Sequence, residues 1–172
     1  MKIVLIGYMG SGKTAVGKIL AHELQIPFMD LDAEIEKQLG CSISQIFSDK
    51  GEIYFRKQEN IVLQRLLAEN ENFVLATGGG TPCYGNTLEM LLNNKEITTI
   101  YLKVSIQTLE ARLFSDKEKR PLLAHIDTTE ALNDFIRKHL FERSYFYNQA
   151  GLVVENEGSL NQTVSKIRAA LL

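Results

Sequence analysis

The sequence predicts an α/β domain in which helices flank a parallel β-sheet. Three observations lead to this fold class. Short apolar runs alternate with helix-like stretches along the whole chain. The first apolar run is followed directly by a glycine-rich loop that opens a helix. The composition, 45% hydrophobic and 23% charged with three prolines, excludes disordered, collagen-like and low-complexity classes.

Five segments have the composition of buried parallel strands. Helices cover both faces of such a strand, so its sequence is a nearly continuous aliphatic and β-branched run. The expected strands are Lys2–Ile6, Pro27–Asp30, Phe73–Thr77, Thr98–Val104 and Leu152–Glu155.

Six segments between and after these strands are expected to be helical. The first places Val16, Ile19, Leu20 and Leu24 on one helical face. The charged segment Ser115–Arg120 has no apolar anchor and predicts an exposed, mobile loop. The expected helices are Thr14–Leu24, Ala33–Leu39, Glu52–Leu67, Ile106–Leu113, Thr129–Tyr147 and Leu160–Leu171.

Length and charge restrict the organisation and the partners. A chain of 172 residues suits one domain, residues 1–172. Nineteen basic and 21 acidic residues give no excess of positive charge, which argues against nucleic acid as a partner. No segment approaches the roughly 20 apolar residues of a membrane span. Cys41 and Cys83 form neither a disulfide framework nor a zinc motif. We therefore expect a cytoplasmic protein, and a monomer because no heptad seam is present.

The strongest motif runs from Gly7 to Thr14, GYMGSGKT, a complete phosphate-binding loop between a strand and a helix. Its backbone N–H groups and the N-terminus of the following helix favour bound phosphate. Lys13 is expected to reach the β- and γ-phosphates of a nucleoside triphosphate, and the Thr14 hydroxyl to bind Mg²⁺ directly. The predicted nucleotide-binding residues of the loop are Gly10, Ser11, Gly12, Lys13, Thr14 and Ala15.

A phosphate-binding loop is compatible with a kinase or a GTPase switch. A GTPase carries a guanine-reading NKxD motif and a DxxG switch motif. The segment Asn94–Ile97 lacks the aspartate, and DxxG does not occur in the sequence. The sequence therefore favours a kinase.

Two carboxylates, Asp30 and Asp32, follow the second expected strand, at the sheet edge where ligands bind. Residues two apart on an extended chain share a face, so one carboxylate can act on the water shell of a metal and the other on an acceptor hydroxyl. The alternative is a pair of surface carboxylates with Asp32 as a helix N-cap.

Further candidate residues follow along the chain. Arg56 and Glu59 are three residues apart and can pair on a helix, as ordinary surface pairs also do. The glycines of TGGGT suit close backbone approach to a ligand or a tight turn. Arg120, at the end of the charged loop, is placed to reach the γ-phosphate from a lid. Arg143 lies near the end of an aromatic-rich helix, and for both Arg120 and Arg143 an ordinary surface position is the alternative.

Taken together, these motifs resemble the shikimate kinase family in order and spacing over nearly the whole chain. The resemblance implies a P-loop NTPase fold similar to the nucleoside monophosphate kinases, with a five-stranded parallel sheet of order 2-3-1-4-5. It further implies an acceptor-binding region at about residues 32–60 and a LID at about residues 112–125. The implied activity is ATP-dependent phosphorylation of the 3-hydroxyl of shikimate, on the route to aromatic amino acids.

The same resemblance implies a role for each motif residue. Asp32 would contact the acceptor hydroxyls and act as the base, and Asp30 would hold Mg²⁺ through water. Arg112 would flank the adenine. Phe47 and Phe55 would line the acceptor pocket or belong to the core. The implied catalytic residues are Lys13, Asp32 and Arg120, with Arg120 also contacting ATP, and the implied shikimate-binding residues are Asp32, Arg56, Gly78, Gly79, Gly80 and Arg143.

Two other functions remain open at this point. One is a P-loop kinase for another small acceptor, such as gluconate or a nucleotide. The second is a nucleotide-binding module without turnover. The segment Pro82–Gly85, which departs from the apolar pattern expected in the family, affects the detail of the acceptor pocket and not the chemistry.

Overall fold

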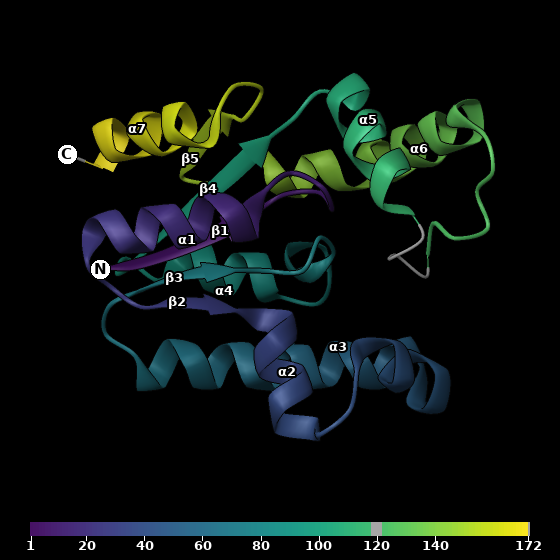
Figure 1. Ribbon diagram of the computed structural model, residues 1–172. Helices are drawn as coiled ribbons and strands as arrows, with labels where there is room; N and C mark the ends of the chain where they lie inside the picture. Colours follow the sequence, from purple (N-terminus) through teal and green to yellow (C-terminus); the bar gives the residue numbers. More distant parts are fainter. Residues whose placement is uncertain (118–121, 172) are drawn as a thin grey trace.

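The computed structural model describes residues 1–117 and 122–171 and has three layers, with helices on both faces of one sheet (Figure 1). The strands are β1 (Lys2–Ile6), β2 (Phe28–Asp30), β3 (Phe73–Ala76), β4 (Ile97–Lys103) and β5 (Leu152–Glu155). The helices are α1 (Lys13–Leu24), α2 (Leu31–Leu39), α3 (Ile43–Glu69), α4 (Thr87–Asn93), α5 (Ile106–Asp116), α6 (Thr129–Tyr147) and α7 (Leu160–Leu171), with a 3₁₀ turn at Thr81–Cys83.

The sheet is parallel and has the order β2-β3-β1-β4-β5, as the family resemblance implied. Because all strands run the same way, their carboxyl ends meet at one edge. The phosphate-binding loop follows β1 at that edge. The N-terminus and the end of α7 lie at the opposite end of the molecule (Figure 1).

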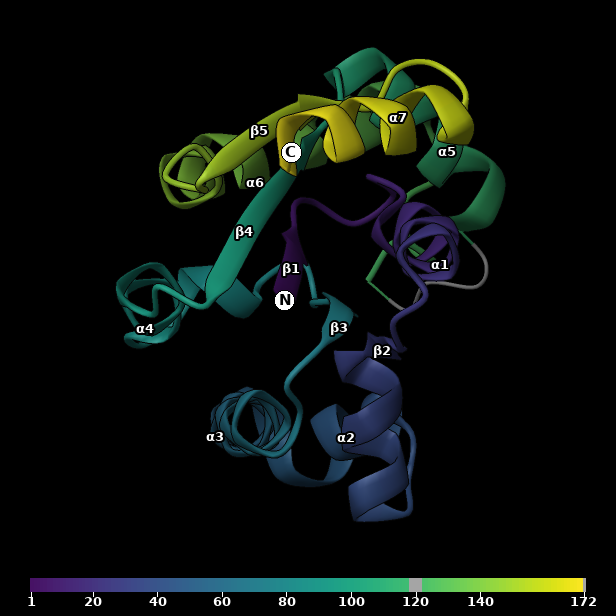
Figure 2. The same ribbon diagram turned by 90° about the vertical axis from the view of Figure 1, so that its left-hand side faces the viewer.

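Alternate residues of β1 face opposite helical layers. Ile3 and Leu5 lie in the core under α1 and α7, whereas Val4 and Ile6 lie in the larger core under α3, α4 and α6. All four side chains are fully buried. The end-on view separates these two layers (Figure 2). The continuous apolar run in the sequence thus reflects a strand covered on both faces.

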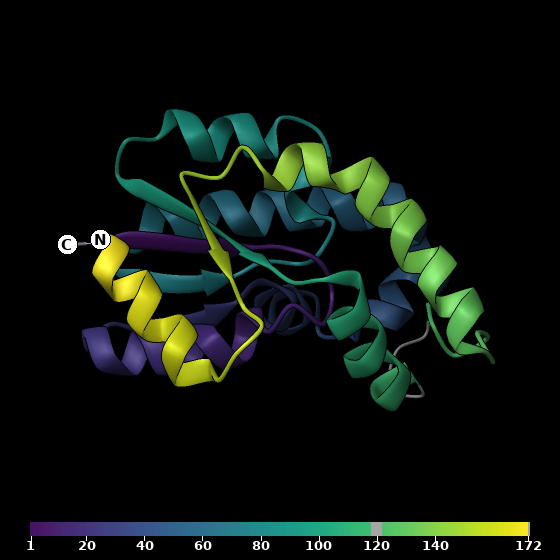
Figure 3. The same ribbon diagram turned by 90° about the horizontal axis from the view of Figure 1, so that it is seen from above.

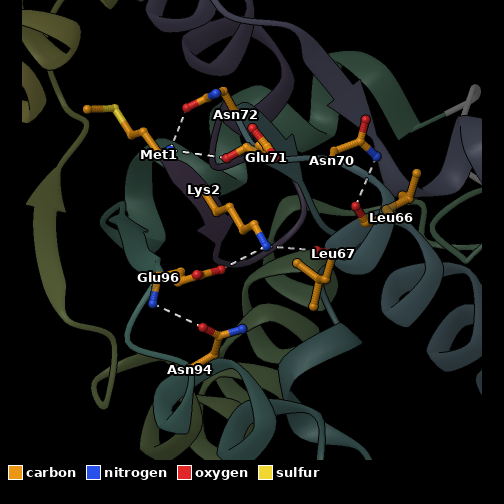
Figure 4. Close-up of polar contacts among 9 residues, drawn as sticks. All are labelled: Met1, Lys2, Leu66, Leu67, Asn70, Glu71, Asn72, Asn94 and Glu96. Atoms are coloured by element: carbon orange, nitrogen blue, oxygen red, sulfur yellow. Dashed lines mark hydrogen bonds and ion pairs between the residues drawn. The ribbon is translucent and has the colours of Figure 1, made fainter.

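Polar contacts close the sheet edge that lies away from the phosphate-binding loop (Figure 4). The Met1 ammonium donates to Asn72 Oδ1 at 2.6 Å. Lys2 Nζ donates to the Leu67 carbonyl at 3.0 Å and pairs with Glu96 at 3.1 Å. The carbonyls at the end of a helix lack partners within the helix. Lys2 therefore joins β1 to the end of α3 and to the start of β4.

Helix α3 contains a break at Gly51, whose φ of 82° and ψ of 174° are not helical. The φ value lies in the region that glycine adopts without strain. The sequence prediction of a helix from Glu52 is correct for the part after the break. The part before it, which begins with a capping box between Ser42 and Gln45, was not predicted.

Two other predictions differ from the structure. Helix α4 was not predicted at all. Helix α5 ends at Asp116, so Ser115 and Asp116 form its last turn and are not part of a loop. Residues 118–120 of the expected loop lie outside the described residues, and Leu123, which follows in the sequence, is fully buried. Viewed from above, α5 and α6 form one end of the molecule beside the strand ends (Figure 3).

Candidate active site

The phosphate-binding loop joins β1 to α1 in the predicted position. Gly12 precedes the first turn of α1 with a φ of 90°, which orients the loop backbone without a side-chain cap. The free N–H groups of the first turn and the helix dipole favour an anion in front of this turn. Lys13 Nζ lies against the loop and donates to the carbonyls of Gly7 at 2.7 Å and Tyr8 at 2.9 Å.

Asp30 connects this loop to the end of β2. Its Oδ2 accepts a hydrogen bond from the Thr14 hydroxyl at 2.9 Å. Its Oδ1 accepts from the backbone N–H groups of Asp32 at 3.1 Å and Ala33 at 3.4 Å. Asp30 is therefore the N-cap of α2. The alternative interpretation, with Asp32 as the cap, is wrong.

Asp32 lies in the first turn of α2, so the two carboxylates do not share a strand face as expected. Burial, together with the negative charges of Asp30 and Glu59, raises the pKa of Asp32 from 3.8 to about 6. Lys13 acts in the opposite direction. A carboxylate with a pKa near neutrality can hold or release a proton under physiological conditions, which suits a general base.

The turn Gly78–Gly80 after β3 brings the acceptor-side residues together. A Cβ built on Gly78 would lie 3.4 Å from Asp32 Oδ1, and one on Gly79 would lie 3.7 Å from Arg143 Nη1. A Cβ on Gly80 would lie only 2.6 Å from Arg56 Nη2. The predicted base and both predicted arginines therefore surround this turn. The absence of side chains lets them approach its backbone.

Arg56 is held by a network on α3. Its Nη1 contacts Glu59 Oε2 at 2.8 Å, which confirms the predicted i,i+3 pair. Glu59 is 3% exposed, and its other oxygen accepts from the Thr81 hydroxyl at 2.7 Å. A buried carboxylate needs such partners. Arg56 and Glu59 are thus not an ordinary solvated pair.

Arg143 lies on α6, where aromatic side chains surround it. Its guanidinium interacts with the hydroxyl of Tyr147, four residues later, and its Cζ lies 5.9 Å from the centre of the Tyr8 ring. The Tyr147 hydroxyl donates to the Gly79 carbonyl at 2.5 Å. The Tyr8 hydroxyl is 3.0 Å from His139 Nδ1 on the same helix. Tyr8 therefore connects the phosphate-binding loop to the helix that carries Arg143.

Arg112 and Asn156 border the other side of the phosphate-binding loop. Arg112 donates to the carbonyls of Gly10 and Asn156, both at 3.1 Å. Asn156 is fully buried and donates to the Ser11 carbonyl at 2.7 Å. Its Oδ1 accepts from the Thr163 hydroxyl at 2.7 Å. No sequence feature predicts this contact of Asn156, because its partner lies 145 positions away along the chain.

A cavity of about 460 Å³ contains most of the predicted nucleotide and catalytic positions. Asp32 lines it together with the phosphate-binding loop, so the predicted base and the predicted phosphate site share one space. Arg56 and Arg143 do not line this cavity and lie around the glycine turn beside it. Arg120 lies outside the described residues. The lining residues are Met9, Gly10, Gly12, Lys13, Thr14, Ala15, Asp30, Asp32, Thr77, Gly78, Gly79, Arg112, Ser115 and Asp116.

Phe47 and Phe55 pack together on the two parts of α3, with ring centroids 4.6 Å apart. Phe55 is 4% exposed and belongs to the larger core, whereas Phe47 is 37% exposed. Of the two alternatives for Phe55, a core position is observed.

Within residues 1–117 and 122–171, no three His, Cys, Asp or Glu side chains are grouped as a metal site. Nor does any helix in these residues have the length and apolar character needed to cross a membrane. The Thr14 hydroxyl and the Asp30 carboxylate are hard oxygen donors at the phosphate site. This small donor set fits Mg²⁺, which keeps several waters and binds substrate phosphates as well.

The chain is similar to shikimate kinases over nearly its whole length. The family model for shikimate kinase matches residues 9–172. A shikimate kinase from Flavobacterium johnsoniae is 48% identical over 168 residues, 96% of each chain. The crystal structure of shikimate kinase from Bacteroides thetaiotaomicron has a TM-score of 0.90 and 35% identity, covering 99% of this chain and 98% of that one. A structure of the Acinetobacter baumannii shikimate kinase in complex with shikimate has a TM-score of 0.86 and 34% identity, covering 99% and 92%.

Proposed function

Because the chain belongs to the shikimate kinase family, we propose that its site transfers the γ-phosphoryl group of ATP to the 3-hydroxyl of shikimate. The products are shikimate 3-phosphate and ADP. One observation carries the proposal: Asp32 and two arginines meet at the glycine turn beside the phosphate-binding loop. A planar guanidinium matches the shikimate carboxylate in geometry and charge.

In the proposed reaction, Asp32 accepts the proton of the 3-hydroxyl as that oxygen attacks the γ-phosphorus. The bond to the β,γ-bridging oxygen breaks, and ADP leaves. The Asp32 pKa of about 6 keeps most of this side chain ionised at pH 7 and therefore able to accept the proton. Lys13 stabilises the charge on the transferring group, and Arg120 is proposed to do the same.

Mg²⁺ would be held by the Thr14 hydroxyl directly and by Asp30 through water, and it supplies neutralising charge on the phosphates. The hydrogen bond of 2.9 Å between Thr14 and Asp30 supports this assignment, because it brings the two oxygen donors together. Asp30 is further oriented by the start of α2, which it caps.

The acceptor is proposed to lie between Asp32 and the turn Gly78–Gly80, with its carboxylate toward Arg56 and Arg143. On the nucleotide side, residues Gly10–Ala15 would bind the phosphates. Arg112, which contacts the phosphate-binding loop and the loop after β5, is proposed to flank the adenine. The LID at about residues 112–125 would cover the nucleotide.

We further propose that the protein works as a cytoplasmic monomer without nucleic acid as a partner. Its two cysteines are free thiols, which suits a reducing compartment. Size-exclusion chromatography with light scattering tests the oligomeric state.

The decisive experiment is a coupled assay of ADP release with Mg²⁺-ATP and shikimate, gluconate or AMP in separate reactions. Stimulation by shikimate alone supports the proposal. Faster turnover with gluconate or AMP contradicts the acceptor assignment. ATP binding without turnover on any acceptor would indicate a non-catalytic nucleotide-binding module.

A further inference from the structure

The guanidinium of Arg56 lies close to two aromatic rings and to two carboxylates. Its Cζ lies 4.0 Å from the centre of the Tyr84 ring and 5.1 Å from that of Phe55. Glu59 binds Nη1 at 2.8 Å, and Glu52 lies 3.5 Å from Nε. Two rings and two carboxylates therefore lie close to this cation.

Tyr84 reaches Arg56 from a different part of the chain. It directly follows the 3₁₀ turn Thr81–Cys83. In this turn the Cys83 N–H donates to the Gly80 carbonyl at 2.9 Å. A Cβ on Gly80 would lie 3.1 Å from the Tyr84 ring and 2.6 Å from Arg56 Nη2. The missing side chain at Gly80 thus provides the space in which Tyr84 and Arg56 meet.

The two carboxylates do not determine the plane of the Arg56 guanidinium. Glu59 holds Nη1 at the edge of the guanidinium by a hydrogen bond, whereas Glu52 lies beside Nε without one. A group held at its edge can still rotate out of plane. The Tyr84 ring, over which Cζ lies at 4.0 Å, restricts that rotation because the guanidinium has little space to turn against it. A bidentate contact with a carboxylate depends on the plane of the guanidinium, since the two N–H groups must point in parallel.

We infer that Tyr84 is a positioning residue for acceptor binding, which fixes the plane of the Arg56 guanidinium for the carboxylate of the substrate. This inference rests on the proposed function, in which Arg56 binds that carboxylate. Tyr84 is 38% exposed and contributes little to the core, so its replacement leaves the fold intact. We expect its replacement to change the binding of the acceptor and not the binding of ATP.

The test compares Tyr84→Leu with Tyr84→Phe. The leucine variant removes the ring and is expected to raise KM for shikimate about 5- to 10-fold, with kcat and KM for ATP within about twofold of wild type. The phenylalanine variant keeps the ring and is expected to stay close to wild type. Tyr145→Leu on α6 is the matched control, because Tyr145 is 72% exposed and lies outside the site.

A double-mutant cycle with Arg56→Lys separates positioning from a general structural effect. If Tyr84 acts through the plane of Arg56, Tyr84→Leu adds less than twofold to KM for shikimate in the lysine background, since the planar group is already gone. Additive effects, an unchanged KM for shikimate in Tyr84→Leu, or an equal loss for ATP and shikimate would overturn the inference.

The outcomes also separate this inference from the proposed function. Wild-type protein that shows no shikimate-dependent ADP release refutes the proposed function itself. If the wild-type protein phosphorylates shikimate and Tyr84→Leu has the same kinetics, only the proposed role of Tyr84 is refuted. Thermal unfolding of all variants checks folding, and Tyr84→Phe provides the comparison if the leucine variant is unstable.

Discussion

Replacement of Asp32 by asparagine is expected to remove most of the activity and to stabilise the protein near neutral pH. Asparagine is close in shape to the carboxyl group but carries no charge and cannot accept the proton. Loss of a general base lowers kcat by about 10²- to 10⁴-fold. The gain in stability follows from the environment of the side chain, because burial, Asp30 and Glu59 all oppose its ionisation.

The magnitude follows from the pKa of Asp32 in the two states. The pKa is 3.8 for the ordinary group and about 6 in the folded protein. The folded state therefore binds this proton more tightly, and the free energy of unfolding falls as pH rises from about 4 to about 6. At pH 7 the ionised group costs at most about 3 kcal/mol, and at pH 4.5 about 1 kcal/mol.

Thermal unfolding of wild type and Asp32→Asn at pH 7 and pH 4.5 measures this effect. A cost of about 3 kcal/mol corresponds to a rise in Tm of about 6–12 °C for a domain of this size. The rise should shrink by more than half at pH 4.5. Asp49→Asn, at an exposed position on α3, is the control for the same substitution away from the site. A lower Tm for Asp32→Asn at pH 7, or a rise independent of pH, would refute the reasoning.

Three further substitutions test other parts of the site. Lys13→Met should lower kcat by about 10²- to 10³-fold in steady-state assays, since it removes the cation proposed to stabilise the transferring phosphoryl group; unchanged kcat would contradict that role. Asn156→Leu removes the side-chain donor to the Ser11 carbonyl and leaves the Thr163 hydroxyl with only its 3.4 Å contact to the Ser159 carbonyl, so urea unfolding should show a loss of about 2–4 kcal/mol and assays a higher KM for ATP. Gly80→Ala places a methyl group against Arg56, and KM for shikimate should rise about tenfold with KM for ATP unchanged; equal changes in both would argue against a local effect.

Much of the fold could be predicted from local patterns. The runs at Lys2–Ile6 and Leu152–Glu155 are observed as strands with the predicted bounds, because buried parallel strands carry an uninterrupted apolar sequence. The strand order, in contrast, came from the family resemblance. No local pattern contains that order, because it depends on which strands pair across long connections.

The missed helices have physical explanations. Helix α4 has seven residues and only Leu88 and Leu91 as buried apolar side chains, too few to show helical periodicity. The first part of α3 had a usable signal in the capping box of Ser42 and Gln45. Gly51 obscured it, because a glycine before a helical stretch suggests a helix boundary.

In the candidate site, some residues could be predicted from short motifs and others could not. The phosphate-binding loop, the Arg56–Glu59 pair and the glycine turn lie in short motifs, and the structure brings all three to one edge of the sheet. The contributions of Asn156 and Tyr84 depend on tertiary contacts alone. Asn156 meets the phosphate-binding loop through the packing of α7, and Tyr84 meets Arg56 across the glycine turn.

The position of Asn156 has a consequence for the order in which the protein matures during synthesis. The phosphate-binding loop is made within the first 14 residues, yet the amide that holds its Ser11 carbonyl lies at position 156 and is itself fixed by Thr163. A nascent chain released from the ribosome up to α6 already contains every motif residue of the site. Its nucleotide loop lacks this support until β5 has paired with β4 and α7 has docked, so we expect such a fragment to bind ATP more weakly than the full chain.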